Sequence, residues 1–129
     1  MNILVIDAQG GGIGKQIVSA LKKCYPEQYI TAVGTNSLAT SAMLKAGADV
    51  AVIVCSRKAD VIVGPVGIVI ADALLGEITA AMATAVGRST AKRILVPVNH
   101  CDNYIVGVTD LSMTKLVDGV VTEVGKLIG

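Results

Sequence analysis

Short apolar runs rich in β-branched residues alternate along the chain with segments whose apolar positions recur every three or four residues. The first pattern predicts strands buried on both faces of a parallel sheet, and the second predicts amphipathic helices. The predicted strands are residues 3–6, 29–33, 50–54, 60–63, 93–98 and 104–108. The predicted helices are residues 13–24, 38–46, 67–75 and 80–86, with a last helix that starts at Ser112. Ser37 and Thr79 stand where they can cap the second and fourth of these helices.

This alternation is typical of an α/β domain built in three layers, and we expect a Rossmann-like fold with a mostly parallel sheet. Only residues 55–59 separate the third and fourth predicted strands, which is fewer than the dozen or so that a parallel crossover needs. We therefore expect an antiparallel pairing at one edge of the sheet. No linker, repeat or low-complexity tract interrupts the chain, so residues 1–129 are expected to form a single domain.

Composition and charge exclude several classes of function. Hydrophobic residues make up 53% of the 129 positions, and 11 Lys and Arg balance 10 Asp and Glu. Because there is no basic cluster and the only aromatic residues are three tyrosines, nucleic acid is not an expected partner. The longest apolar stretch, residues 61–71, is too short for the ~20 residues of a membrane span, so no membrane association is expected.

The cysteines and the start of the chain indicate a cytoplasmic protein. Three cysteines without a CxxC pair favour a reducing compartment over a disulfide framework, and no secretory signal opens the sequence. Cys24 lies on the apolar stripe of the first predicted helix, and we expect it in the core.

The most informative motif is the turn between the first predicted strand and the first helix. It reads Asp7-Ala8-Gln9-Gly10-Gly11-Gly12-Ile13-Gly14-Lys15. Glycines let a ligand approach the backbone closely, and a helix N-terminus offers free N–H groups and the positive end of the helix dipole. We predict that Asp7 and residues 10–14 bind a nucleotide, a dinucleotide or another phosphorylated small ligand. The alternative is that the glycines serve only a tight turn and close helix packing.

Known phosphate-binding motifs match this turn only in part. The dinucleotide fingerprint G-x-G-x-x-G fits Gly10 and Gly12 but finds Lys15 in place of its third glycine. The P-loop pattern ends in the same Gly-Lys pair, but Gln9 and Gln16 replace its first glycine and its hydroxyl residue, so an NTPase is not expected. The turn also resembles the T-G-x-x-x-G-I-G glycine turn of short-chain dehydrogenases, although the Tyr-x-x-x-Lys pair of that family is absent from the chain.

Two further strand ends are expected at the same edge of the sheet, where open α/β sheets bind their ligands. Thr35 and Asn36 follow the second predicted strand, where an acidic residue would bind the ribose of NAD, so the sequence does not favour NAD. Gly64 and Pro65 form another strand-to-helix turn with little side chain, which suits either a flat ligand or simply a tight turn. We include these four residues in the predicted ligand site.

Three reactive side chains keep an enzyme open as an alternative. Asp7 carries a charge at the end of a buried strand, so it needs hydrogen bonds from the glycine turn or a bound cation. Cys55 and His100 would form a thiol–imidazole site if folding brings them together, whereas a solvated histidine beside a small apolar cysteine is the simpler interpretation. No spacing of ligand residues indicates a metal site.

The apolar excess also bears on assembly, because a small monomer has to cover its hydrophobic surface. Residues 71–86 combine alanines and Met82 with only two charges, Asp72 and Glu77. We expect this region to form the contact of a homodimer or a higher homo-oligomer.

A resemblance to one family extends over nearly the whole chain. The matching stretches are residues 5–7 with 9–15, 31–37, 43–49, 64–65 with 67–68, and 75–79. They are similar to a family of short Rossmann-like proteins, a domain of unknown function found mainly in Clostridia-type bacteria. The chain departs from that family in having fewer residues between Asp49 and Val52. The resemblance implies the fold and adds no activity or cofactor.

Three functions are therefore compatible with the sequence. The first is a binding module for a phosphorylated ligand at the Gly10–Gly14 turn. The second is an enzyme that uses the same pocket, with Asp7, Cys55 or His100 as reactive groups. The third is a homo-oligomeric structural subunit without a ligand.

Overall fold

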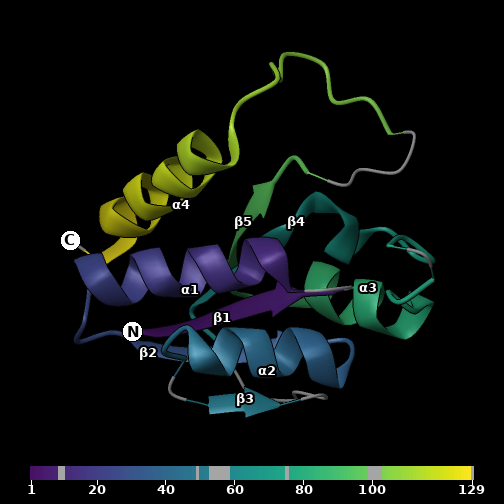
Figure 1. The fold of residues 1–129 in the computed structure, drawn as a ribbon. Coiled ribbons are helices and arrows are strands. Elements are labelled where there is room, and N and C mark those ends of the chain that lie inside the picture. The colour runs from purple at the N-terminus through teal and green to yellow at the C-terminus, as the bar shows by residue number, and fades with distance from the viewer. Residues whose placement is uncertain (9–10, 49, 53–58, 75, 99–102, 129) are drawn as a thin grey trace.

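The computed structural model describes residues 1–8, 11–48, 50–52, 59–74, 76–98 and 103–128, in which strands and helices alternate along the chain (Figure 1). In chain order the elements are β1 (Asn2–Asp7), α1 (Gly12–Cys24), β2 (Tyr29–Gly34), α2 (Ser37–Lys45), β3 (Val50–Val52), β4 (Val61–Pro65), the 3₁₀ helix η1 (Val66–Val69), α3 (Ala80–Arg88), β5 (Lys92–Val96) and α4 (Met113–Ile128). None of the helices in the described ranges combines the length and the apolar character needed to cross a membrane.

The strands form one sheet in the order β3-β2-β1-β4-β5, and every described pairing is parallel. From β1 the chain moves outward through β2 to β3, and then returns to β4 on the other side of β1. The strand order therefore reverses between β1 and β4. Because the strands are parallel, all their carboxyl ends lie at the same edge of the sheet.

The predicted antiparallel edge is wrong, because β3 and β4 are not neighbours and the described strands are all parallel. Three strand spacings of ~4.8 Å separate β3 from β4, about 14 Å in all. A chain as long as residues 53–60 reaches roughly 26 Å when it is extended. The minimum of a dozen residues applies to a crossover that contains a helix, so a short sequence gap does not force two strands to pair antiparallel.

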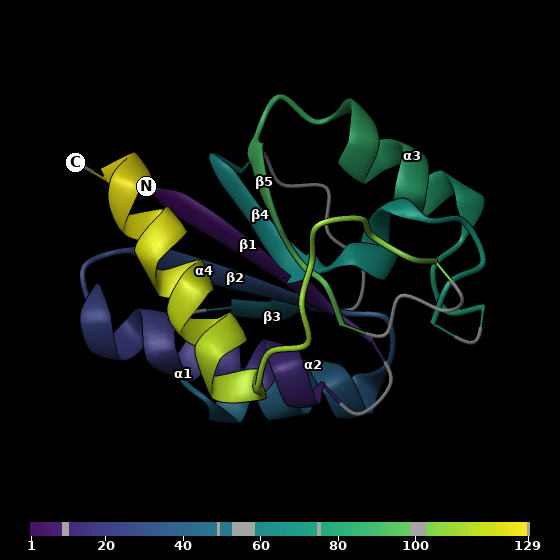
Figure 2. The same ribbon diagram turned by 90° about the horizontal axis from the view of Figure 1, so that it is seen from above.

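Helices cover both faces of the sheet, as the alternating pattern predicts (Figure 2). Successive side chains of β1 point to opposite faces. Ile3 and Val5 pack in a core beneath α1, α2 and α4, whereas Leu4 and Ile6 pack in a second core beneath η1 and α3. The strand ends that carry the predicted ligand site are therefore packed between a core on each face of the sheet.

The helix predicted at residues 67–75 is wrong in its described part, because residues 67–69 belong to the 3₁₀ helix η1 and residues 70–74 form a bend and turns. After η1 the backbone turns through positive φ angles of 64° at Asp72 and 56° at Leu74. The Asp72 N–H donates to the carbonyl oxygen of Ile78 at 2.7 Å, which closes the turn. Leu74 and Ile78 are each only 1% exposed, so burial of these two side chains in the second core outweighs the local preference for a helix.

Some local predictions are confirmed and others are wrong. Thr79 caps α3 as predicted, but Asn36 rather than Ser37 caps α2 with its side-chain oxygen. Cys24 is exposed and not in the core, because it is the last residue of α1. Residues 104–108 form no strand.

The turn that replaces the predicted helix gives the first testable prediction. Replacing Leu74 with alanine should lower the free energy of unfolding by about 2–5 kcal/mol, because the side chain is buried. Replacing Leu44, which is 51% exposed on α2, with alanine should change it by no more than about 0.5 kcal/mol. Urea unfolding followed by circular dichroism measures both values, and equal losses would contradict the placement of Leu74.

Candidate functional site

The carboxyl ends of β1 and β2 bring several predicted site residues together. Asp7 ends β1 and leads into the glycine turn, and Thr35 and Asn36 follow the end of β2. The N–H of Thr35 donates to the backbone carbonyl oxygen of Asp7 at 3.1 Å, which ties the two strand ends together. The predicted residues are therefore neighbours at the edge where open α/β sheets bind ligands.

The carboxylate of Asp7 supplies a hydrogen-bond acceptor for the first turn of α1. The N-cap of this helix is Gly11, which has no side chain to cap it. Asp7 Oδ2 accepts the N–H of Gly14 at 2.7 Å, and Oδ1 accepts the N–H of Ala8 at 2.8 Å. Of the two roles expected for Asp7, acceptor for the turn or ligand for a cation, the first is the one that these bonds confirm.

Burial dominates the titration of this carboxyl. Asp7 is 3% exposed, and burial raises its pKa above the ordinary value of 3.8. The N–H groups of Gly14 and Ala8 act in the opposite direction, because they stabilise the charged form. The negative charge of Glu77 raises the pKa of Asp7 further.

Three glycines of the turn have three different surroundings. Gly11 has a φ of 73°, and a Cβ atom there would lie 2.8 Å from the Cα of Ala39. A Cβ atom on Gly14 would lie 2.6 Å from the Sδ of Met43, so this glycine lets α1 pack closely. Gly12 is exposed, and nothing lies within 4 Å of where its Cβ would be. Packing explains Gly11 and Gly14, but it does not explain Gly12.

Gly12, which faces open space, is the first residue of α1. The first N–H groups of a helix have no intrahelical acceptor, and they carry the positive end of the helix dipole. Asp7 satisfies only one of them, the N–H of Gly14. The side chain of Ile13 is buried in the core, so it offers no surface to a ligand. Among the described residues, no side chain of the turn lies over the exposed backbone at Gly12, the position where an anionic group can approach the helix N-terminus.

Glu77 belongs to this cluster although the sequence analysis missed it. Its Oε1 accepts the hydroxyl of Thr35 at 2.5 Å and the side-chain N–H of Asn36 at 2.7 Å. The turn with positive φ at Asp72 and Leu74 brings Glu77 to the end of β2. Backbone strain of this kind concentrates at functional sites. The only signal in the sequence was a charged residue within an otherwise apolar segment.

Gly64 and Pro65 lie at the same edge, but their surroundings point to packing. A Cβ atom on Gly64 would lie 2.5 Å from the carbonyl oxygen of Ile6 and 3.0 Å from the Cδ1 of Ile68. Pro65 is buried and precedes η1 with a φ of −61°. A tight turn against β1 therefore accounts for both residues.

Three predicted residues, Gly10, Cys55 and His100, lie outside the described residues, and the predicted thiol–imidazole site stays a prediction. In the ranges that the structure does describe, no three His, Cys, Asp or Glu side chains gather as metal ligands would.

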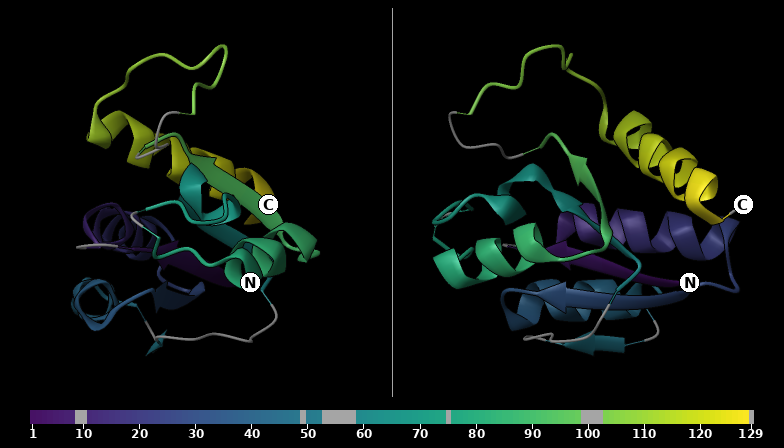
Figure 3. Two further views of the ribbon diagram at one scale, coloured as in Figure 1. Left: turned by 90° about the vertical axis from the view of Figure 1, so that its right-hand side faces the viewer. Right: turned by 180° about the vertical axis from the view of Figure 1, so that it is seen from behind.

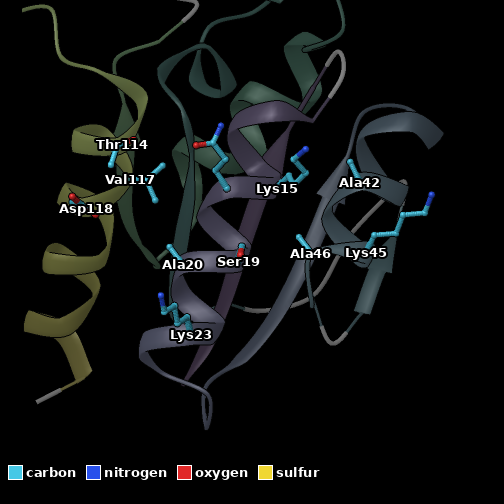
Figure 4. Close-up of a pocket in the computed structure, with 11 residues that line it drawn as sticks. Lys15, Ser19, Ala20, Lys23, Ala42, Lys45, Ala46, Thr114, Val117 and Asp118 are labelled. Atoms are coloured by element: carbon cyan, nitrogen blue, oxygen red, sulfur yellow. The ribbon is translucent and has the colours of Figure 1, made fainter.

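A separate groove crosses α1 between α2 and α4, with a volume of about 520 Å³ (Figure 4). Small or apolar side chains, among them Ala20 and Val117, line it together with Lys15, Lys23 and Lys45. In a P-loop, the lysine that follows the last glycine reaches the phosphates held by that loop. Here the lysine that follows Gly14, Lys15, lines the groove between α2 and α4.

Strand order and turn geometry define the class of this protein as an open parallel α/β sheet with a glycine-rich helix N-terminus at the point where the strand order reverses. A family model described as a domain of unknown function (DUF3842) matches residues 2–129, and the chain belongs to this family. Neither the curated proteins nor the solved structures contain a match.

A matched pair of variants tests the different surroundings of the glycines. Gly14→Ala should lower the free energy of unfolding by about 1–3 kcal/mol, because the new methyl group clashes with Met43 and disturbs the bond to Asp7. Gly12→Ala should leave stability unchanged or raise it by up to about 1 kcal/mol, because its Cβ enters open space. Thermal or urea unfolding distinguishes the two, and similar stabilities would contradict the packing of α1 against β1.

The raised pKa of Asp7 predicts how stability depends on pH. Because the folded state keeps this proton to a higher pH than the unfolded state does, the free energy of unfolding should fall as pH rises from 3.8 through the folded pKa. The Asp7→Asn variant lacks this titrating group. The free energy of unfolding of the wild type minus that of the variant should therefore decrease as pH rises from 3.8 through the folded pKa of Asp7. Urea unfolding of both proteins between pH 3.5 and 7 measures the difference, and an increase with pH would overturn the assignment.

Proposed function

We propose that this protein is a Rossmann-like binding module that takes a nucleotide or another phosphorylated small ligand at the Gly10–Gly14 turn. The observation that carries the proposal is Gly12, an exposed backbone position at the N-terminus of α1, where a Cβ atom would meet no atom of the other described elements within 4 Å. A phosphate needs such an approach to the backbone N–H groups of a helix.

The division of roles among the glycines supports a nucleotide site. In dinucleotide-binding turns, one glycine allows the tight turn, another lets the phosphate approach the backbone, and a third permits close helix packing. Gly11, Gly12 and Gly14 have surroundings that suit these roles in this order. The strand order β3-β2-β1-β4-β5 also matches the first five strands of the Rossmann sheet, whose ligands bind where the order reverses.

Glu77 favours a nucleotide over a simple phosphate ester. Rossmann folds bind ribose hydroxyls with an acidic residue near the end of the second strand. The residues that follow β2 here, Thr35 and Asn36, are uncharged, but both donate hydrogen bonds to the Glu77 carboxylate. The missing acidic residue that counted against NAD in the sequence is thus supplied by a later segment.

The environment of Asp7 favours binding over catalysis at this turn. Both of its oxygens accept backbone N–H groups, and the side chain is almost completely buried. A general base has to reach a proton on the substrate. Asp7 instead stabilises the turn, and the reactive pair of the enzyme alternative, Cys55 and His100, lies outside the described residues.

A titration with a panel of nucleotides tests the proposal. The panel contains AMP, ADP, ATP, NAD and NADP, and calorimetry measures each dissociation constant. Gly12→Val should weaken binding of the best ligand at least tenfold, because the side chain occupies the approach to the backbone. The control is Gly87→Val on α3, which also enters open space on an exposed helix and should leave the affinity unchanged.

Two outcomes would contradict the proposal. The first is a wild-type protein that binds no member of the panel and no inorganic phosphate. The second is equal loss of affinity in the Gly12 and Gly87 variants, since that would place the ligand elsewhere.

A further inference from the structure

The segment between β5 and α4 is unusual for its exposed apolar side chains. Residues 103–112, called the arm below, leave the body of the molecule after β5 and return at the start of α4 (Figures 1 and 3). Val106 is fully exposed and Tyr104 is 87% exposed. Ile105, Val108 and Leu111 are exposed as well. No other described segment of similar length exposes as many large apolar residues.

The last strand before the arm, β5, forms one edge of the sheet. β5 pairs with β4 on one side, and within the described strands it has no partner on the other. Leu95 of this strand is exposed. An unpaired edge strand offers a row of backbone N–H and C=O groups to any extended segment that can reach it.

A cavity of about 600 Å³ lies between the arm and the body. Pro97 and Val98, just after β5, line one side, and Leu116 of α4 lines another. Thr109 and Asp110 of the arm add polar groups. The described side chains of this copy leave that space unfilled.

We infer that the arm is the contact segment of a homodimer, in which the arm of each copy packs against β5 and the cavity of the other. Both halves of the contact occur on the same chain, so a two-fold axis satisfies both at once. Residues 105–108 form a turn, in which the Val108 N–H donates to the carbonyl oxygen of Ile105 and Gly107 has a φ of 86°. The turn leaves the side chain of Val106 fully exposed. A second copy supplies apolar surface on which that side chain can pack, at Leu95 of β5 and in the cavity.

The exposed area agrees with a second copy as the partner. The apolar residues of the arm and Leu95 together expose on the order of several hundred Å², the size of the largest apolar patches of monomers, which often serve as interaction sites. A standard interface buries about 800 Å² on each partner, a comparable area.

The arm is a different surface from residues 71–86, where self-association was expected, and that expectation stays a prediction. The apolar side chains buried in the protein's own core within that region are Ala73, Leu74, Ile78, Ala83 and Val86. The exposed apolar residues described in that region are alanines, at positions 71, 80, 81 and 85. The arm contact is independent of the ligand site, so either can fail while the other stands.

Light scattering coupled to size-exclusion chromatography tests the inference. Wild-type protein should be dimeric, and Val106→Asp should raise the dimer dissociation constant at least tenfold, because it places a charge in an apolar contact. Leu44→Asp is the control, since Leu44 is an exposed apolar residue on α2, far along the chain from the arm, and its replacement should leave the dimer intact. A monomeric wild-type protein, or a Val106→Asp variant that dimerises as well as wild type, would overturn the inference.

A cross-linking experiment tests the register between copies. Leu95→Cys protein is mixed with Val106→Cys protein and oxidised mildly, and mass spectrometry identifies the linked peptides. A disulfide between positions 95 and 106 supports the inference, because in this mixture it forms only between two copies. The wild-type protein, which has three cysteines of its own, gives the background level of cross-linking. If neither engineered cysteine forms a disulfide above that level, the inferred contact is wrong.

Discussion

The hydrogen bond from the Gly14 N–H to the buried Asp7 carboxylate is the contact on which the site depends. It holds the first turn of α1 against the end of β1, and this close approach requires a glycine at position 14. The same aspartate binds the end of β2 through its backbone carbonyl oxygen, which accepts the N–H of Thr35. One residue thus fixes the positions of two strand ends and a helix N-terminus, and leaves Gly12 exposed between them.

The spacing of apolar residues along the chain was sufficient to predict those helices and strands whose buried side chains follow that spacing. β1, β2, α1 and α4 are examples, because their apolar positions face the cores that their spacing predicts. The antiparallel edge was wrong because strand order depends on long-range pairing, which a count of intervening residues does not determine. The helix at residues 67–75 was wrong because Leu74 and Ile78 gain more by reaching the core than a helix would gain locally.

The candidate site could also be predicted only in part from the sequence. Asp7, Gly12, Thr35 and Asn36 could be found because they follow strands, and parallel strands end at one edge. Glu77 could not, because a turn through positive φ at two residues other than glycine places it there, and such a turn has no sequence signature. The sequence alone could not separate the roles of the glycines, since only the structure shows that Gly11, Gly14 and Gly64 allow close packing whereas Gly12 faces open space.

Native mass spectrometry of the protein, isolated gently from the cells that produce it and compared with the same sample after denaturation, tests the central claim most directly. The account predicts a retained mass that matches a nucleotide or another phosphorylated metabolite and disappears on denaturation. The same preparation of the Gly12→Val variant should lack that mass. A wild-type protein that carries no additional mass, and stays bare after nucleotides are added, would contradict the account and favour a structural subunit.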